Sequence, residues 1–157
     1  MRFVIVTGMS GAGKSTALKM LEDVGYFCVD NLPVPLIPKF AELLAVPGTE
    51  MNKAALGVDI RSGQSFRELA NVLKVLDEGG CQYEILYLES SDDVLVKRYK
   101  ETRRMHPIEN TNGLLASIRQ ERKMLSALYE ASDYVIDTSH LTAQGLLQEL
   151  KEIYASG

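Results

Sequence analysis

The fold is decided near the N-terminus by the stretch Phe3-Val4-Ile5-Val6-Thr7-Gly8-Met9-Ser10-Gly11-Ala12-Gly13-Lys14-Ser15. Its first four residues are apolar and mostly β-branched, which predicts a strand buried on both faces, as in a parallel sheet. The residues from Gly8 to Ser15 follow the spacing G-x-x-x-x-G-K-S, and apolar side chains at helical spacing continue to about Val24. A strand, a glycine-rich turn and a helix in this order are typical of a P-loop.

The residue types in this loop suit a chain of phosphates. The glycines allow the backbone to curl so that successive N–H groups point into one concavity, and the start of the helix adds unpaired amides and a positive dipole end. Lys14 supplies a mobile positive charge for the β- and γ-phosphates, and the Ser15 hydroxyl can ligate Mg²⁺. We therefore predict that ATP or GTP binds with Mg²⁺ at the following residues: Gly8, Met9, Ser10, Gly11, Ala12, Gly13, Lys14 and Ser15.

The composition is that of an ordinary globular domain. The 157 residues suit a single domain over 1–157, with 46% apolar and 24% charged residues. The net charge of −4 argues against general, non-specific binding of nucleic acid by the whole chain. Cys28 and Cys81 lack metal-binding spacing, so we expect reduced thiols. The chain shows neither a signal-peptide pattern nor an apolar run of membrane-spanning length, and we expect a cytoplasmic protein without a membrane partner.

Strand and helix patterns alternate along the rest of the chain. After the first strand, strands are predicted at about 26–29, 54–60, 83–88 and 134–136. Helices are predicted between and after them, at about 36–44, 65–76, 92–102, 114–129 and 142–154. This alternation predicts an α/β fold with a parallel five-stranded sheet flanked by helices, that is, a P-loop NTPase.

Three acidic residues lie at or near the ends of predicted strands. Because the carboxyl ends of parallel strands gather ligand groups, Asp30, Asp59 and Glu89 are candidates to hold Mg²⁺. The run from Leu56 to Asp59 fits a Walker-B-like strand best, so Asp59 is predicted to serve the metal together with Ser15, and Glu89 is the rival. Arg61 lies two residues beyond Asp59, either in the same rim of loops or on the surface.

A basic segment runs from Lys97 to Pro107, from the end of a helix into a loop broken by proline. Arginines on such a lid can neutralise a γ-phosphate during transfer, and Arg103 and Arg104 are the candidates, with Arg98 second. Two other interpretations stay open: a patch for nucleic acid or a protein partner, and cations that simply favour a helix C-terminus. We expect His106 to belong to the structure of the lid rather than to catalysis.

These stretches together resemble the RapZ/YvcJ family of P-loop nucleotide-binding proteins. The most specific matches are Gly25-Tyr26-Phe27-Cys28-Val29-Asp30-Asn31-Leu32-Pro33 and Arg98-Tyr99-Lys100-Glu101-Thr102-Arg103-Arg104-Met105-His106-Pro107. Asp59-Ile60-Arg61 and Val135-Ile136-Asp137-Thr138-Ser139 also match, and the matching segments span nearly the whole chain. The resemblance implies a nucleotide-kinase-like fold with a basic lid, binding of ATP and GTP, and slow hydrolysis. It also implies a guanine-nucleotide segment at Asp59, Ile60, Arg61 and Ser62.

Members of that family are longer and carry a second domain, which in characterised relatives binds small regulatory RNA and an amino-sugar phosphate. We expect this chain to be the N-terminal domain only, so that an RNA or protein partner would depend on the missing C-terminal domain. Three functions remain open. One is a regulatory module with slow ATPase or GTPase activity, in which Lys14, Asp59, Arg103 and Arg104 are catalytic. Another is a small-molecule kinase that uses the lid arginines and Asp30. The third is a non-hydrolysing nucleotide switch for RNA or protein partners.

Overall fold

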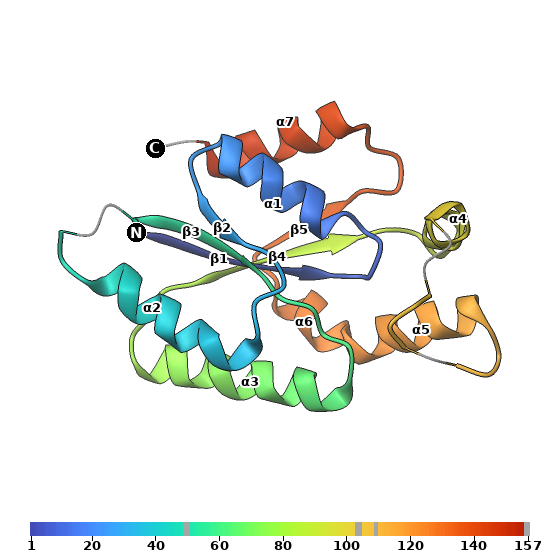
Figure 1. Ribbon diagram of the computed structural model, residues 1–157, viewed down its shortest axis with the longest axis horizontal. Coiled ribbons are helices and arrows are strands. Elements are labelled where there is room, and N and C mark those ends of the chain that lie inside the picture. The colour runs from blue at the N-terminus through green and yellow to red at the C-terminus, as the bar shows by residue number, and fades with distance from the viewer. Residues whose placement is uncertain (49–50, 103–104, 109, 156–157) are drawn as a thin grey trace.

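The computed structural model describes residues 1–48, 51–102, 105–108 and 110–155. Strands and helices alternate through this part of the chain (Figure 1). The strands are β1 (Arg2–Gly8), β2 (Phe27–Val29), β3 (Lys53–Gly57), β4 (Glu84–Glu89) and β5 (Tyr134–Asp137). The helices are α1 (Lys14–Asp23), α2 (Ile37–Ala45), α3 (Gly63–Glu78), α4 (Asp92–Thr102), α5 (Leu114–Met124), α6 (Ser126–Ala131) and α7 (Ala143–Tyr154), and a short 3₁₀ turn, η1 (Val34–Leu36), precedes α2.

The strands form one parallel sheet in the order β2-β3-β1-β4-β5, which confirms the predicted fold class. β1 is the central strand: Val4 lies opposite Ala55 of β3, and Val6 lies opposite Leu86 of β4. From β1 the chain builds β2 and β3 on one side and then crosses to β4 and β5 on the other. The loop after β1 therefore stands where the strand order diverges, the place at which open α/β sheets bind ligands.

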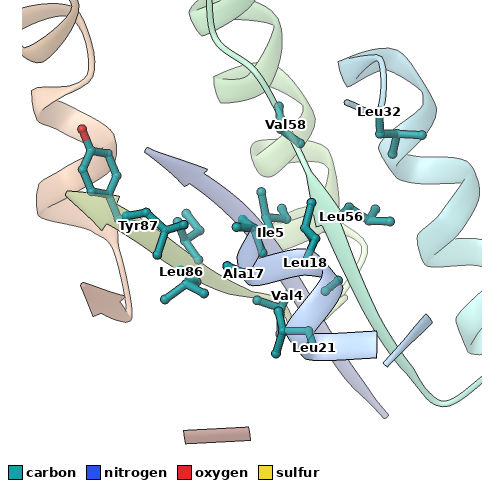
Figure 2. Close-up of a cluster of buried hydrophobic side chains, with 14 of the residues drawn as sticks. Val4, Ile5, Ala17, Leu18, Leu21, Leu32, Leu56, Val58, Leu86 and Tyr87 are labelled. Atoms are coloured by element: carbon teal, nitrogen blue, oxygen red, sulfur yellow. The ribbon is translucent and has the colours of Figure 1, made fainter. Parts of the chain in front are cut away.

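Helices cover both faces of the sheet. α1 and α7 lie over one face, and α2, α3 and α6 lie over the other, whereas α4 and α5 stand beyond the carboxyl ends of the strands (Figure 1). Because side chains alternate along a strand, β1 contributes Val4 and Ile5 to opposite faces, and both are fully buried. Figure 2 shows the apolar side of α1, with Ala17, Leu18 and Leu21, packed into this core. This packing holds the N-terminal end of α1 beside the carboxyl end of β1.

Two predicted elements end differently in the structure. The expected helix over 114–129 bends at Leu125, which has φ −88° and ψ 0°, and so becomes α5 and α6. Backbone hydrogen bonds continue through the bend, from Leu125 N to Glu121 O and from Tyr129 N to Leu125 O. The strand expected over 54–60 ends at Gly57, where its pairing with β1 also ends, opposite Val6; its other neighbour, β2, stops one residue earlier, opposite Leu56. Within the described ranges, none of the helices combines the length and the apolar character needed to cross a membrane.

Candidate functional site

The loop between β1 and α1 is a tight turn fastened to the neighbouring strand. Met9 N donates to Leu88 O at 3.0 Å, and Ala12 N donates back to Met9 O at 3.0 Å. Gly11, at the third position of that turn, has φ +89°, as a type II turn requires. Gly8 has φ +140°, and a Cβ on it would lie 2.2 Å from Leu88 O. Glycine at position 8 is therefore required both by the backbone angle and by the space.

α1 begins directly after this turn and presents its free amides to the loop. Gly13 is left-handed, with φ 102°, and its carbonyl accepts the first helical bond, from Ala17 N at 2.9 Å. The amides of Lys14, Ser15 and Thr16 in the first turn have no acceptor within the helix. Among the described residues, no side chain caps this end. The turn and the helix start thus have the backbone geometry that the motif predicts, and the binding of an anion there stays a prediction.

Lys14 extends toward the end of β3. Its Nζ lies 2.7 Å from Asp59 Oδ1 and 3.4 Å from Gly8 O, and the Lys14 side chain is only 12% exposed. Burial raises the pKa of Asp59, but the charge and hydrogen bond of Lys14, followed by those of Arg61, outweigh it, so that the pKa is lowered overall. Asp59 is therefore an ionised partner for the lysine that is predicted to meet the phosphates.

A second acid reaches the predicted metal ligand. Asp30 follows β2, and its Oδ2 accepts a hydrogen bond of 2.6 Å from Ser15 Oγ. The backbone turns sharply there, because Asn31 has φ 54° and Leu32 N donates to Gly57 O at the end of β3. The two acids therefore have different partners: Asp59 forms an ion pair with Lys14, and Asp30 accepts a hydrogen bond from Ser15.

Glu89, the third acid, points into a different cluster. It forms an ion pair of 2.5 Å with Arg122 of α5 and also accepts a hydrogen bond from Ser90 N at 2.8 Å. Arg122 in turn contacts Asp92 at 2.7 Å. Glu89 is thus bound by an arginine, whereas Asp30 and Asp59 contact the residues of the loop.

A cavity of about 560 Å³ opens over the loop. Its lining combines the loop, the acid and arginine after β3, the end of α4 and two residues beyond it: Ser10, Gly11, Gly13, Lys14, Ser15, Thr16, Asp59, Arg61, Arg98, Tyr99, Thr102, Met105 and Pro107. A hollow of similar size, about 580 Å³, lies at the amino ends of the strands, beside Arg2 and Glu84, which pair with each other. We place the site at the first cavity, because the phosphate-binding loop lines it.

The segment after β3 is only partly turned toward this cavity. Arg61 lines it, with a side chain 63% exposed and Nη2 3.5 Å from Asp59 Oδ2. Ile60, in contrast, is buried in the core. The Ser62 hydroxyl caps α3 by accepting a hydrogen bond of 3.1 Å from Ser65 N. Of the four residues expected to hold guanine nucleotide, Asp59 and Arg61 therefore lie at the cavity. Met9 and Ala12 are also buried, so their side chains face the core rather than the cavity.

The predicted lid arginines, Arg103 and Arg104, lie outside the described residues. The residues on both sides of them line the cavity, including Met105, whose side chain is among the most exposed apolar ones at 82%. The basic segment is therefore close to the loop at both of its described ends.

Arg98 and Thr138 hold the far side of the loop, a role that the sequence did not indicate. The Arg98 guanidinium donates to Gly11 O and to Thr138 O, each at 2.9 Å. The hydroxyl of Thr138 donates to Ala12 O at 2.8 Å. The N–H of Gly13 belongs to the same peptide unit as the Ala12 carbonyl and points the opposite way. Fixing the carbonyl therefore also fixes the direction of that amide.

The chain is similar to known proteins along its whole length. Residues 1–157 match the model of the RapZ-like N-terminal domain. A nucleotide-binding protein of Lachnoclostridium phytofermentans is 57% identical over 98% of this chain and 54% of its own length, and one of Ruminiclostridium cellulolyticum is 54% identical over 100% and 54%. The chain thus spans about half the length of these curated relatives.

Two solved structures that share the fold have low sequence identity with the chain. A shikimate kinase from Bacteroides thetaiotaomicron superposes with a TM-score of 0.62 at 15% identity, covering 97% of each chain. A shikimate kinase from Acinetobacter baumannii in complex with shikimate gives 0.62 at 19%, covering 98% of this chain and 93% of that one. At these identities the likeness establishes the P-loop kinase fold alone. The matches to the family model and to the nucleotide-binding relatives go further, and on their evidence the chain belongs to the RapZ-like family.

Proposed function

We propose that this chain binds ATP or GTP with Mg²⁺ and hydrolyses it slowly, as the nucleotide-binding domain of a regulatory protein. The observation that carries the proposal is the convergence of Lys14, the free amides at the start of α1 and the Asp59 carboxylate on one cavity, with Asp30 bonded to Ser15, which also lines it. The family membership supports nucleotide binding, because similar chains are named nucleotide-binding proteins. Phosphates would lie in the curled loop, with Lys14 moving from Asp59 to their oxygens.

The donor set fits Mg²⁺. This ion usually takes one or two carboxylates and completes its shell with water and phosphate oxygens, so it does not need a dense cluster of ligands. Among the described residues, no group of three or more His, Cys, Asp or Glu side chains converges, which agrees with such a site. Ser15 and Asp59 are the proposed ligands, and Asp30, which is bonded to Ser15, is a further one. When bound, the ion would offset negative charge on the phosphates.

Slow turnover is expected because Glu89 and Asp59 already contact positively charged side chains. Glu89, which could otherwise orient a water molecule, is held by Arg122. Asp59 also contacts Arg61, so part of its charge stays compensated when Lys14 moves to the phosphates. Arg103 and Arg104 stay the proposed groups for neutralising charge on the transferred phosphate.

A small-molecule kinase is the second candidate, and one observation favours it. Arg61 presents an exposed guanidinium on the same cavity as Lys14, and Asp30 lies beside it at Ser15. An acceptor with a hydroxyl and an acidic group could contact Asp30 and Arg61, respectively. A non-hydrolysing switch is the third candidate. Whether the chain is a slowly hydrolysing module or a non-hydrolysing switch, an RNA or protein partner would bind the second half that the longer relatives contain. The protein would act in the cytoplasm.

Phosphate release with ATP and with GTP, in the presence and absence of a panel of metabolites, separates these functions. We expect slow release that needs Mg²⁺ and does not depend on any metabolite. A metabolite that raises turnover by about a hundredfold and becomes phosphorylated would overturn the regulatory proposal in favour of the kinase. Nucleotide binding without any release would favour the switch.

A further inference from the structure

A buried acid of α5 is bonded to the phosphate-binding loop. The side chain of Glu121 is 1% exposed. Its Oε1 accepts a hydrogen bond of 3.0 Å from Ser10 N, and its Oε2 accepts one of 2.6 Å from Ser10 Oγ. A charged side chain is rarely buried this completely unless polar partners satisfy it, and here both loop donors come from one residue, 111 positions away.

His106 supplies the third contact of this carboxylate. Its Nε2 lies 3.3 Å from Glu121 Oε1, and its Nδ1 accepts a hydrogen bond of 3.0 Å from Ile108 N. Since Nδ1 is an acceptor, the ring proton of the neutral imidazole belongs on Nε2, which therefore donates to the carboxylate. The imidazole also packs against Tyr99 of α4, with ring centroids 5.2 Å apart. His106 thus holds Glu121 in the orientation that meets Ser10.

The bond from Ser10 N matters because of the turn in which it lies. The peptide unit between Met9 and Ser10 has its carbonyl bonded to Ala12 N and its amide bonded to Glu121, so that both of its edges are fixed. That unit opens the turn whose third residue, Gly11, adopts φ +89°. Rotation of this peptide would break the turn and redirect the amides that follow it.

We propose that Glu121, oriented by His106, is a positioning residue that keeps the Ser10 peptide of the P-loop in its phosphate-binding conformation. The inference rests on the proposed binding of nucleotide at this loop. Tyr99 strengthens the argument, because its ring comes within 3.3 Å of the place that a Cβ on Gly11 would occupy. The end of α4, the residue His106 and the helix α5 therefore converge on two successive loop residues, Ser10 and Gly11.

The first test is the variant Glu121→Gln, with Glu130→Gln as the matched control. Glutamine has nearly the same shape but no charge, so the hydrogen bonds from Ser10 N and His106 Nε2 lose their charge assistance, and its NH₂ group can donate only to Ser10 Oγ, whose proton must turn away. Glu130 is an exposed acid on α6, so its substitution removes the same charge without touching the loop. Titration calorimetry with ATP, GTP and inorganic tripolyphosphate should show affinities about ten- to a hundredfold weaker for Glu121→Gln, as expected for lost charge-assisted hydrogen bonds, and unchanged for Glu130→Gln.

Two further comparisons separate positioning from mere stability. His106→Gln retains an N–H near the position of Nε2, whereas His106→Phe retains only the ring, so affinity should be close to that of the unsubstituted chain in the first and reduced in the second. Ser10→Ala removes the hydroxyl donor. The Ser10 N–H, which carries the proposed positioning, is kept in Ser10→Ala, so affinity should fall less in Ser10→Ala than in Glu121→Gln, and the two losses should be partly non-additive in the double variant.

The outcomes distinguish this inference from the proposed function. If the unsubstituted chain binds nucleotide and Lys14→Ala does not, unchanged affinity in folded Glu121→Gln overturns the inference alone. A loss in Ser10→Ala larger than that in Glu121→Gln would overturn it as well, since the hydroxyl and not the Ser10 peptide would then carry the effect. Unfolding of both Glu121→Gln and His106→Phe would show that the cluster serves stability and would also overturn it. Failure of the unsubstituted chain to bind any of the three probes would overturn the proposed function together with the inference.

Discussion

Gly8→Ala tests whether the loop has the geometry described here. The added Cβ would lie 2.2 Å from Leu88 O and 2.6 Å from Leu88 N, both of them backbone atoms that cannot rotate away. A non-glycine residue at φ +140° costs about 1–3 kcal/mol in backbone strain. Relieving the clash requires β1 and β4 to separate near the hydrogen bond from Met9 N to Leu88 O, whose loss from a buried site costs about 1–3 kcal/mol more.

We therefore expect Gly8→Ala to lower the free energy of unfolding by about 4 kcal/mol, which corresponds to a fall in Tm of about 8–16 °C for a chain of this size. Gly25→Ala is the matched control, because Gly25 also has positive φ, +106°, but no atom lies within 4 Å of its Cβ position. That variant should lose only the cost of the left-handed backbone, about 1–2 kcal/mol.

Urea denaturation followed by circular dichroism measures both variants. The difference between the two losses isolates the clash with Leu88, because the strain from positive φ is common to both variants. Losses that agree within about 1 kcal/mol would refute the reasoning, since they would mean that β4 does not approach Gly8 as closely as described.

The remaining predictions concern the groups around the loop. Thr138 is 4% exposed and bonds to Ala12 O, so Thr138→Val should lower the free energy of unfolding by about 1–3 kcal/mol and weaken ATP binding; equal stability by urea denaturation would contradict this. Because the pKa of Asp59 is lower in the folded protein than in the unfolded chain, its pairing with Lys14 stabilises the fold fully above the ordinary value of 3.8 and progressively less as the pH falls below it. When the urea midpoint of unfolding is measured against pH, it should therefore fall less steeply at acid pH in Asp59→Asn than in the unsubstituted chain. An equally steep fall would argue against the pairing.

The loop was predictable because local physics fixes most of its residues. Gly8 and Gly11 are required by backbone angles and close approach, and Lys14 and Ser15 are the residue types that the proposed phosphate and metal chemistry favours. Periodicity likewise predicted every strand of the sheet, since the apolar runs are short and bounded by turns. These features depend on residues close together in the chain, which a sequence displays directly.

The supports of the loop could not be predicted in the same way. Glu121 contacts Ser10, and Arg98 contacts Gly11, across 111 and 87 positions, and nothing in either local pattern indicates such a partner. The sequence favoured Asp59 as the metal-side acid but left Glu89 and Asp30 as candidates. Only the packing of α5 shows that Arg122 engages Glu89, which leaves Asp30 and Asp59 at the loop. The bend at Leu125 was missed for a similar reason, because the apolar spacing of one helix continues through it.

The most direct test of the central claim is titration calorimetry of ATP and GTP, with Mg²⁺, on the unsubstituted chain, on Lys14→Ala and on Lys19→Ala. Lys19 is an exposed lysine of the same helix, so its variant controls for the loss of a positive charge. We expect the unsubstituted chain and Lys19→Ala to bind nucleotide alike, and Lys14→Ala to bind it at least about a hundredfold more weakly while its circular dichroism spectrum is unchanged. Equal affinity of Lys14→Ala and the unsubstituted chain would contradict the account.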